Sequence, residues 1–534
     1  MYEVLMVTPF GFVFELSGTC SYFSEYGFFD VYINGEFYTS SDINVVTLLS
    51  LEPNTYYEVE VVDCNEVVVS FGVMTLRPNY LVNVKDFNAA GDGVSNDTAA
   101  VNAAIYTTPV GSTVVFPKGE YLVDQILLRS GVDLYLAKGA KIIRNNDKQA
   151  AIIKGYLRSF DGLDTDVNTT WEGNPLDCHT ALVYGKNIRD VHIYGEGVFD
   201  GNGSGLWDSK HEKDRSSKNI LIVDSVNIEI SGVSSINSVS WSIHALKCEN
   251  INLRALFIHS KDKSRLSDGI VTESCHSMEI IGCQINVGND CISIKSGKYY
   301  MSMHHRRPTR SVTIKNCMLE NGQSAVTVGS EISCGVFGAE VKLCLFENTR
   351  HGLHIKTRRG RGELAVVDGI SLKNVKMEGV RHCIAVNMFY NTERHGKSEY
   401  VTNRKSGKKD DFTPTVRNIW LNNIHAKNIG GSAIFIYGLP ENPVGQILIM
   451  DSYFRFAGPD SRIHECPSEM SDFEVIENLG FFFENADEVI LSNNKAAGNC
   501  VNHANIVVME WSDGEPHSCG GGLEAGIKFN ATAL

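Results

Sequence analysis

Apolar and polar residues alternate along the first part of the chain, with turn residues between the alternating runs. The stretches VYINGEFYTS, YYEVEVV and VVVSFGVMTL are rich in β-branched and aromatic residues and carry no helical stripe. This pattern predicts a small all-β domain, a β-sandwich, over residues 1–78.

The pattern changes near residue 79. The segment VKDFNAAGDGVSNDTAAVNAAI predicts a strand, a Gly/Asp turn and a helix near residues 96–106, with Asn96 or Asp97 as its N-cap. A long series of short apolar strands follows. The second apolar residue of each V-x-I-like triplet falls at Ile230, Leu253, Ile280, Ile314, Leu343, Leu372, Leu421, Ile449 and Leu491.

Most of these intervals suit one coil of a parallel β-solenoid, and longer gaps suit loop insertions. The Asn or Cys after several triplets (KNC, LKN, LNN, LSN) suits its tight turns. A leucine-rich horseshoe needs a more uniform, Leu-dominated repeat, and a propeller needs closed four-strand blades. We therefore predict an all-β protein in which a right-handed parallel β-helix over residues 79–534 follows the sandwich, with the helix as an N-terminal cap.

The amino-acid composition limits the classes of partner, substrate and metal site that we expect. The 534 residues are 43% hydrophobic and 21% charged, with a net charge of −15, which disfavours nucleic acid and anionic membranes as partners. A polyanionic substrate would need a locally basic cleft. The 14 Cys are scattered without a CxxC pair, so we expect buried thiols rather than a disulfide framework, a metal site or a metal cofactor.

The chain start and its apolar runs bear on location. The segment MYEVLMVTPFGFVFELSG has no basic region before its apolar residues, and no uncharged run approaches 18 apolar residues. We expect a cytoplasmic protein, or a secreted one if a leader is missing. The oligomeric state is left open by the sequence.

Two carboxylates are candidates for chemistry. Asp268, in LSDGI, lies 22 residues before Asp290, in GNDCISIKSG. Residues about one coil apart stack at roughly 4.8 Å, so the two could face one cleft. Such a pair is common by chance and, taken alone, is more typical of solvated turn residues than of a catalytic site.

The surrounding motifs resemble two families. The segment LEPNTYYEV resembles the corner of fibronectin type III sandwiches, where a tyrosine binds backbone; a spacer or a carbohydrate-binding role would both suit it. From about residue 84 to 494 the chain resembles glycoside hydrolase family 28, the polygalacturonases. VKDFNAAGDG, SDGI, GNDCISIKSG, VGSEISCGV and HIKTRRGRG carry that resemblance in order and spacing.

The resemblance implies a pectin-directed hydrolase. Family members hydrolyse α-1,4-linked galacturonic acid with inversion, which places an acid and a base about 6.5 to 9.5 Å apart. The GSE-type segment and KTRRGRG look most like bacterial members that trim galacturonic acid from chain ends. We therefore expect an exo-acting enzyme on acidic oligosaccharides from pectin.

The resemblance also assigns residues. Asp268 and Asp290 match the carboxylates that position and deprotonate water, whereas Asn289 stands at the general-acid position, where an amide has no proton to deliver. Gln323 and His354 replace the family's His and Arg. Lys356 keeps its identity as a cation for the substrate carboxylate, and His354 would make binding sensitive to pH.

Other residues keep two interpretations. Tyr390 matches a tyrosine that lines the sugar site, or packs in the core. His244 and Lys295 either line the cleft or serve structure. Arg358, Arg359 and Arg361 either provide a positive field or form a solvated basic turn.

Three functions are compatible with these residues. The first is the hydrolase. The second is a non-catalytic pectin-oligosaccharide binder on the same scaffold, suggested by Asn289, Gln323 and His354. The third is a β-helical pectate lyase, which would need a calcium cluster of several carboxylates that the sequence does not offer.

Overall fold

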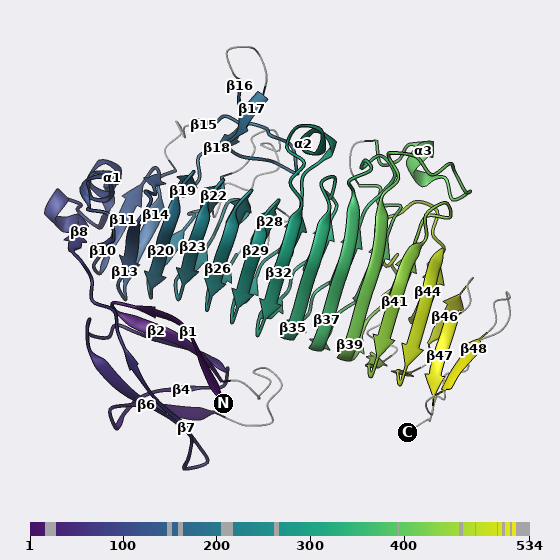
Figure 1. Ribbon diagram of the computed structural model, residues 1–534, viewed down its shortest axis with the longest axis horizontal. Coiled ribbons are helices and arrows are strands. Elements are labelled where there is room, and N and C mark those ends of the chain that lie inside the picture. Colours follow the sequence, from purple (N-terminus) through teal and green to yellow (C-terminus); the bar gives the residue numbers. More distant parts are fainter. Residues whose placement is uncertain are drawn as a thin grey trace.

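The computed structural model describes residues 1–16, 28–146, 152–158, 164–203, 217–260, 266–392, 395–458, 463–475, 477–498, 500–504, 508–512 and 515–519. Figure 1 shows a long stack of strands with a smaller β domain against its N-terminal half. The fold class is therefore all-β, with a parallel β-helix after an N-terminal β domain, as predicted.

The N-terminal domain is a sandwich of two antiparallel sheets. One has the order β1-β2-β5 and the other β4-β3-β6-β7. Its corner carries the predicted tyrosine contact, since Glu52 N donates to Tyr57 Oη at 2.9 Å; the fibronectin type III assignment stays a prediction. The strands are β1 Tyr2–Thr8, β2 Gly11–Leu16, β3 Phe29–Ile33, β4 Glu36–Ser41, β5 Val45–Leu49, β6 Tyr56–Asp63 and β7 Glu66–Met74.

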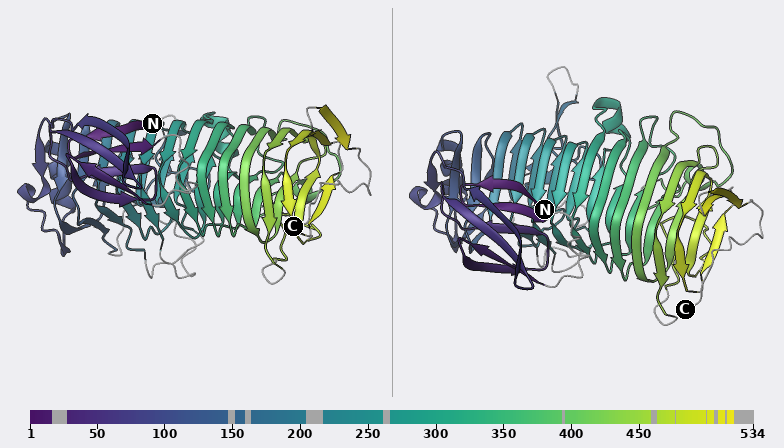
Figure 2. Two further views of the ribbon diagram at one scale, coloured as in Figure 1. Left: turned by 90° about the horizontal axis from the view of Figure 1, so that it is seen from below. Right: turned by 60° about the horizontal axis from the view of Figure 1, so that its bottom comes forward.

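The sandwich packs on the side of the solenoid (Figure 2). Phe10 stacks on Tyr135 with ring centroids 4.2 Å apart. The buried Glu15 carboxylate accepts from Lys315 Nζ at 2.7 Å and from Asn316 Nδ2 at 2.9 Å. An apolar and a charged contact thus fix the sandwich to several coils of the β-helix.

The predicted cap is present as α1, Thr98–Thr107, at the first coil. Asp97 is the N-cap, but its carboxylate accepts from Ala90 N and Gly91 N, while Asn96 Oδ1 accepts from Thr98 N. Both residues predicted as N-cap therefore accept hydrogen bonds from backbone N–H groups. Asp97 binds the turn before α1, and Asn96 binds the first residue of α1. Further short helices are η1 Val84–Phe87, α2 Tyr299–His304 and α3 Glu399–Thr402.

The β-helix consists of two extended sheets whose strands pair in parallel from coil to coil. The larger one holds β8 Leu81–Asn83, β9 Asp92–Asn96, β10 Ser112–Phe116, β11 Gly119–Val123, β13 Val132–Leu136, β14 Ala140–Arg144, β20 Arg189–Gly195, β21 Val198–Asp200, β23 Val226–Ser231, β24 Ser234–Ile236, β26 Glu249–Arg254, β27 Phe257–His259, β29 His276–Ile281, β30 Gln284–Asn286, β32 Thr309–Lys315, β33 Met318–Glu320, β35 Val336–Glu347, β37 Val366–Glu378, β39 Thr415–Ile429, β41 Val444–Met450, β42 Tyr453–Phe456, β44 Ala486–Ser492, β45 Lys495–Ala497, β47 Val508–Ser512 and the antiparallel β48 Glu515–Cys519.

The second sheet carries the candidate site. Its strands are β12 Ile126–Leu127, β19 Val183–Lys186, β22 Ile220–Val223, β25 Ile243–Leu246, β28 Ile270–Glu273, β31 Asp290–Lys295, β34 Ser324–Gly329, β36 His351–Lys356, β38 His382–Asn387, β40 Ser432–Tyr437, β43 Leu479–Glu484 and β46 Val501–Ala504. Two small pairs, β15 Ile152–Ile153 with β18 Cys178–His179 and β16 Tyr156–Arg158 with β17 Asp164–Val167, project beside it in Figure 1.

The predicted apolar ladder exists, with one error of register. Ile230, Leu253, Ile280 and Ile314 pair in sequence, but the next member is Val341 and not Leu343. Leu343 has a positive φ of 55° within β35 and is skipped in the pairing with β37, between Lys342 and Cys344. The run AEVKLCL offers two apolar triplets in the same spacing, so periodicity alone selected the wrong one.

The predicted turn residues are confirmed. Asn316, Asn374, Asn423 and Asn493 follow the triplets and have φ between 51° and 55°, a region that Asn tolerates better than most residues. Asn423 Nδ2 donates to Asn374 Oδ1 at 2.7 Å, so these side chains also bind one another between coils. Cys248, Cys275, Cys283, Cys317 and Cys344 are buried free thiols, as expected.

Candidate active site

The chemistry-bearing residues occupy the outer face of the second sheet. In β31 the apolar Cys291, Ile292 and Ile294 enter the core, whereas Asp290, Ser293 and Lys295 do not. The strand register repeats this spacing on the next two coils. Asp290 pairs with Ser324, which in turn pairs with His351. Ser293 pairs with Thr327, which in turn pairs with His354. One spacing repeated over successive coils therefore produces polar ladders outside the core.

Close approach of two coils depends on Gly329 at the end of β34. An added Cβ at Gly329 would lie 2.2 Å from the Lys356 carbonyl oxygen, and its φ of 106° is unfavourable for other residues. Gly329 thus lets β36 come close enough for Lys356 to pair with the ladder of β31.

The structure brings Asp268, Asn289 and Asp290 together. Asn289 Nδ2 donates to Asp268 Oδ1 at 2.5 Å, and Ser293 Oγ contacts Asp268 Oδ2 at 3.2 Å. Gln323 is the neighbour on the next coil, since its backbone N donates to the Asn289 carbonyl at 2.8 Å. The amide at position 289 is therefore a direct ligand of the neighbouring carboxylate.

The two carboxyl groups differ in their proton affinity. Burial, opposed by Lys295 and reinforced by Asp290, raises the pKa of Asp268 to about 6. Burial acts upward on Asp290 as well, but the charges of Lys356 and Lys295 outweigh it and hold the pKa of Asp290 below its ordinary value. One group is thus suited to carry a proton and the other to accept one.

Two lysines neutralise these carboxylates. Lys356 Nζ lies 3.2 Å from Asp290 Oδ2 and 5.5 Å from the centroid of the Tyr390 ring. Lys295 Nζ lies between Asp268 at 3.6 Å and Glu331 at 3.8 Å. Carboxylates of the chain raise the pKa of both lysines against the effect of burial, so both stay charged.

His244 is structural in this arrangement. Its ring is fully buried, 3.3 Å from Glu273 Oε2 and edge-on to Trp241. Burial lowers the pKa of His244 to about 4, so the ring is neutral near pH 7. Lys295, by contrast, belongs to the site through Asp268.

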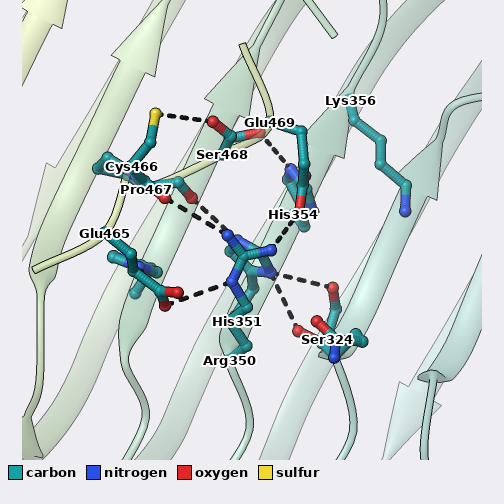
Figure 3. A network of polar contacts seen from close by, with 12 residues as sticks. Ser324, Arg350, His351, His354, Lys356, Glu465, Cys466, Pro467, Ser468 and Glu469 are labelled. Atoms are coloured by element: carbon teal, nitrogen blue, oxygen red, sulfur yellow. Dashed lines mark hydrogen bonds and ion pairs between the residues drawn. The ribbon is translucent and has the colours of Figure 1, made fainter. Parts of the chain in front are cut away.

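A segment from farther along the chain covers the other end of the site. Residues 463–475 are called the strap here, and Figure 3 shows residues 465–469 of the strap beside His351 and His354 of β36. Arg350 binds Glu465 and Glu469 of the strap, and His382 Nε2 lies 3.1 Å from Glu465. His354 Nε2 lies 2.8 Å from Ser468 Oγ, so the predicted substrate-binding ring meets the strap instead.

The histidines under the strap form a stack. The rings of His351 and His354 lie 4.0 Å apart, and both are buried. Burial lowers the pKa of His351 to about 4 and that of His354 well below its ordinary value. His351 Nε2 lies 2.9 Å from the Pro467 carbonyl oxygen, and Nδ1 lies 3.0 Å from the Gln323 carbonyl oxygen and 3.4 Å from the Ser324 hydroxyl. The expected pH-sensitive cation at position 354 is therefore a buried neutral ring.

Of the arginines after Lys356, Arg359 fits neither interpretation. Arg359 is buried and forms a bidentate pair with Glu441, at 2.5 and 2.8 Å. Arg361 is 3% exposed. Arg359 is therefore a neutralised structural group, neither part of a solvated basic turn nor an open cation for the substrate.

The described residues contain no group of three or more His, Cys, Asp or Glu side chains that could hold a metal ion. The calcium cluster that a pectate lyase needs is thus not found in that part of the chain. The same residues contain no helix long and apolar enough to span a bilayer.

Comparison with known proteins identifies the family. The model of glycosyl hydrolases family 28 matches residues 108–432, which include every candidate residue named above. The chain belongs to this family. As a member of family 28 it is a glycoside hydrolase. The acidic residues of its candidate site, Asp268 and Asp290, lie within the matched region.

Relatives within family 28 cover most of the chain. A protein called probable polygalacturonase from Vitis vinifera is 27% identical over 404 residues, 74% of this chain and 77% of the relative. Two solved structures share the fold: the family 28 exopolygalacturonase of Yersinia enterocolitica (TM-score 0.68, 15% identity, 94% and 97% of the two chains) and an exopolygalacturonase of Thermotoga maritima (TM-score 0.59, 21% identity, 83% and 95%).

Sequence reasoning missed several residues of the site. Glu331 lies inside the quoted VGSEISCGV motif, and the outward spacing of Asp290, Ser293 and Lys295 was available as a signal for Ser293. Trp171 and Trp241 stand apart from the quoted motifs. The strap had no signal, because its position depends on a loop folding back over β36 and β38.

Proposed function

We propose that the chain is an inverting, exo-acting hydrolase of α-1,4-linked galacturonic acid in pectin-derived oligosaccharides. The observation that carries the proposal is the joint placement of Asp268, Asp290, Lys356 and Tyr390 on one face of the second sheet. The names of its polygalacturonase relatives support this substrate class.

The residues have distinct roles in this proposal. Lys356 and Tyr390 bind the sugar, with the lysine charge attracting its carboxylate. Asp290, whose pKa is held low, deprotonates the attacking water. Asp268, whose pKa is about 6, is protonated in mildly acidic solution and replaces the missing acid at Asn289.

Exo action is supported by the strap. The segment places Ser468 against His354, where a longer chain of sugars would otherwise pass along the ladder. A site filled at one end by the chain itself favours cleavage of a terminal residue. Gln323 stays partly exposed beside Asn289, and so remains available to the substrate.

The test is incubation of the protein with an oligogalacturonide longer than the trimer, followed by chromatography and by NMR of the first product formed. Galacturonic acid as the only initial product besides the chain shortened by one residue, released with inverted anomeric configuration, is expected. Internal cleavage of longer chains into mixed oligomers would contradict exo action. Retained configuration would contradict inversion.

A second candidate is a galacturonide-binding protein that turns nothing over. The contact between Asn289 Nδ2 and Asp268 Oδ1 favours it, because an amide occupies the acid position and holds the remaining carboxylate. Calorimetric binding of trigalacturonate without product between pH 4 and pH 8 would establish this candidate, and measurable turnover would eliminate it.

A further inference from the structure

A stack of two tryptophans adjoins the candidate site. Trp171 and Trp241 lie parallel, with ring centroids 5.3 Å apart and an angle of 1° between their planes. Trp241 is 4% exposed, whereas Trp171 is partly exposed. The stack therefore ends at the surface in a single indole ring whose inner face is already covered.

The chain fixes this outer indole from below. Lys218 Nζ, fully buried, donates to Thr169 Oγ1 and to the Thr170 carbonyl, both at 3.2 Å. Thr170 Oγ1 donates to Glu273 Oε2 at 2.5 Å. The two residues before Trp171 are thus held by side chains of the second sheet and its edge, which positions the ring before any ligand arrives.

The turn that carries the indole is part of the wall of the site. Backbone bonds in both directions join Trp171 and Asn174, at 2.8 and 3.1 Å. An added Cβ at Gly173 would lie 2.8 Å from Glu331 Cβ, so the turn packs directly on Glu331.

Lys295 connects the stack to the carboxylates. Its Nζ lies 4.6 Å from the Trp241 ring centroid and 3.6 Å from Asp268 Oδ2. The stack and Asp268 are therefore two neighbours of one ammonium group. The side of the site away from the strap ends in an aromatic surface.

We propose that Trp171 is a stacking platform for a pyranose ring, the sugar next to the one bound at Lys356 and Asp290. Rigid aromatic side chains with a fixed orientation are a common lining of ligand sites, and an indole offers a large flat surface to the apolar face of a sugar. The ligand class, an oligogalacturonide, rests on the proposed function. Trp171 is thus a binding residue with no part in proton transfer.

The experiment uses the full chain and the variants Trp171→Ala, Trp171→Phe and Trp420→Ala. Trp420 is 48% exposed on β39 of the other sheet and is the matched control. Calorimetry gives the Kd for mono-, di- and trigalacturonate, and tryptophan fluorescence follows the same titrations. Thermal unfolding of each variant identifies any loss of fold.

We expect Trp171→Ala to weaken trigalacturonate binding about tenfold, with little effect on the monosaccharide. Trp171→Phe should bind with intermediate affinity, while Trp420→Ala binds like the parent. The fluorescence change seen with the parent should disappear in Trp171→Phe. This variant keeps an aromatic ring, so it still tests the proposal if Trp171→Ala does not fold.

The outcomes separate this proposal from the function. Unchanged affinity in folded Trp171→Ala, or an unchanged fluorescence response in Trp171→Phe, would overturn the platform while leaving hydrolysis intact. Binding that depends on Trp171 without any product would uphold the platform and reject the hydrolase. A parent that binds no galacturonide would reject both.

Discussion

The two ends of the site handle charge in opposite ways. At the lysine end, Lys295 of β31 and Lys356, the last residue of β36, are cations paired with Asp268, Asp290 and Glu331. At the histidine end, the neutral rings of His351 and His354, which lie earlier on β36, are buried beneath the strap. The lysine end therefore holds charges that an acidic sugar can compete for, whereas the histidine end is filled by the chain.

Both ends of the site are built on the same columns of paired residues across the second sheet. Asp290 and His351 occupy one column of the sheet, separated by Ser324. What differs is the cover: the turn at Trp171 leaves an aromatic ring partly exposed, while the strap places carbonyl, hydroxyl and carboxylate groups directly on the histidines. Loops between coils, rather than the coils themselves, decide which ladder positions a substrate can reach.

The largest effect is expected from Asp290→Asn at the lysine end. Removing the proposed base should lower kcat for trigalacturonate by roughly 10² to 10⁴ while binding persists. Initial rates and calorimetry on the same preparation measure both. A variant that retains more than a tenth of the parent rate would remove Asp290 from the chemistry.

Lys356→Met removes one of the two cations at the lysine end and so tests the difference between the two ends. Loss of a charged contact to the sugar should raise KM by roughly 10 to 100-fold. Because Lys356 also holds the pKa of Asp290 down, the acidic limb of the pH–rate profile should move to higher pH. Lys342→Met is the control, since Lys342 pairs with Glu340 on the other sheet.

The pH dependence of the parent follows from the two carboxyl groups. Asp268 must be protonated, so the rate should fall about tenfold per unit as pH rises above about 6. Asp290 must be ionised, so the rate should also fall once pH drops below its lowered pKa. Rates of trigalacturonate hydrolysis from pH 3 to pH 8 check both limbs, and a rate that climbs from pH 6 to pH 8 would refute these roles.

The smallest effect is expected at the histidine end. Ser468→Ala removes the partner of both His354 Nε2 and Asn387 Nδ2, and should lower the free energy of unfolding by about 1 to 3 kcal/mol. Urea denaturation at pH 7 measures the change, with Ser40→Ala on the sandwich surface as control. Stability equal to that of the parent would show that the strap is not held through Ser468.

The sequence predicted the repeating part of the molecule well. Apolar triplets and the Asn turns between them identify the solenoid, because each coil repeats the same inward and outward positions. Leu343 was misplaced since two triplets overlap in one strand. The family motifs located Asp268, Asn289, Asp290 and Lys356, which the register then brought together.

The surroundings of those residues could not be predicted in the same way. The burial of His354 depends on Ser468, more than a hundred residues away in a loop of no regular pattern. Arg359 looked like part of a basic turn, and its partner Glu441 lies 82 residues further on. Contacts made by loops of irregular length leave no periodic signal in the chain.

Replacing the side-chain amide of Asn289 by a carboxyl group tests most directly whether these coils form a hydrolytic site. We would measure the initial rate of galacturonic acid release from trigalacturonate by the parent and by Asn289→Asp. The predicted result is slow release by the parent and a rate roughly 10² to 10⁴ higher in the variant, as expected for restoring a positioned acid. No release from either protein would contradict the proposed hydrolase.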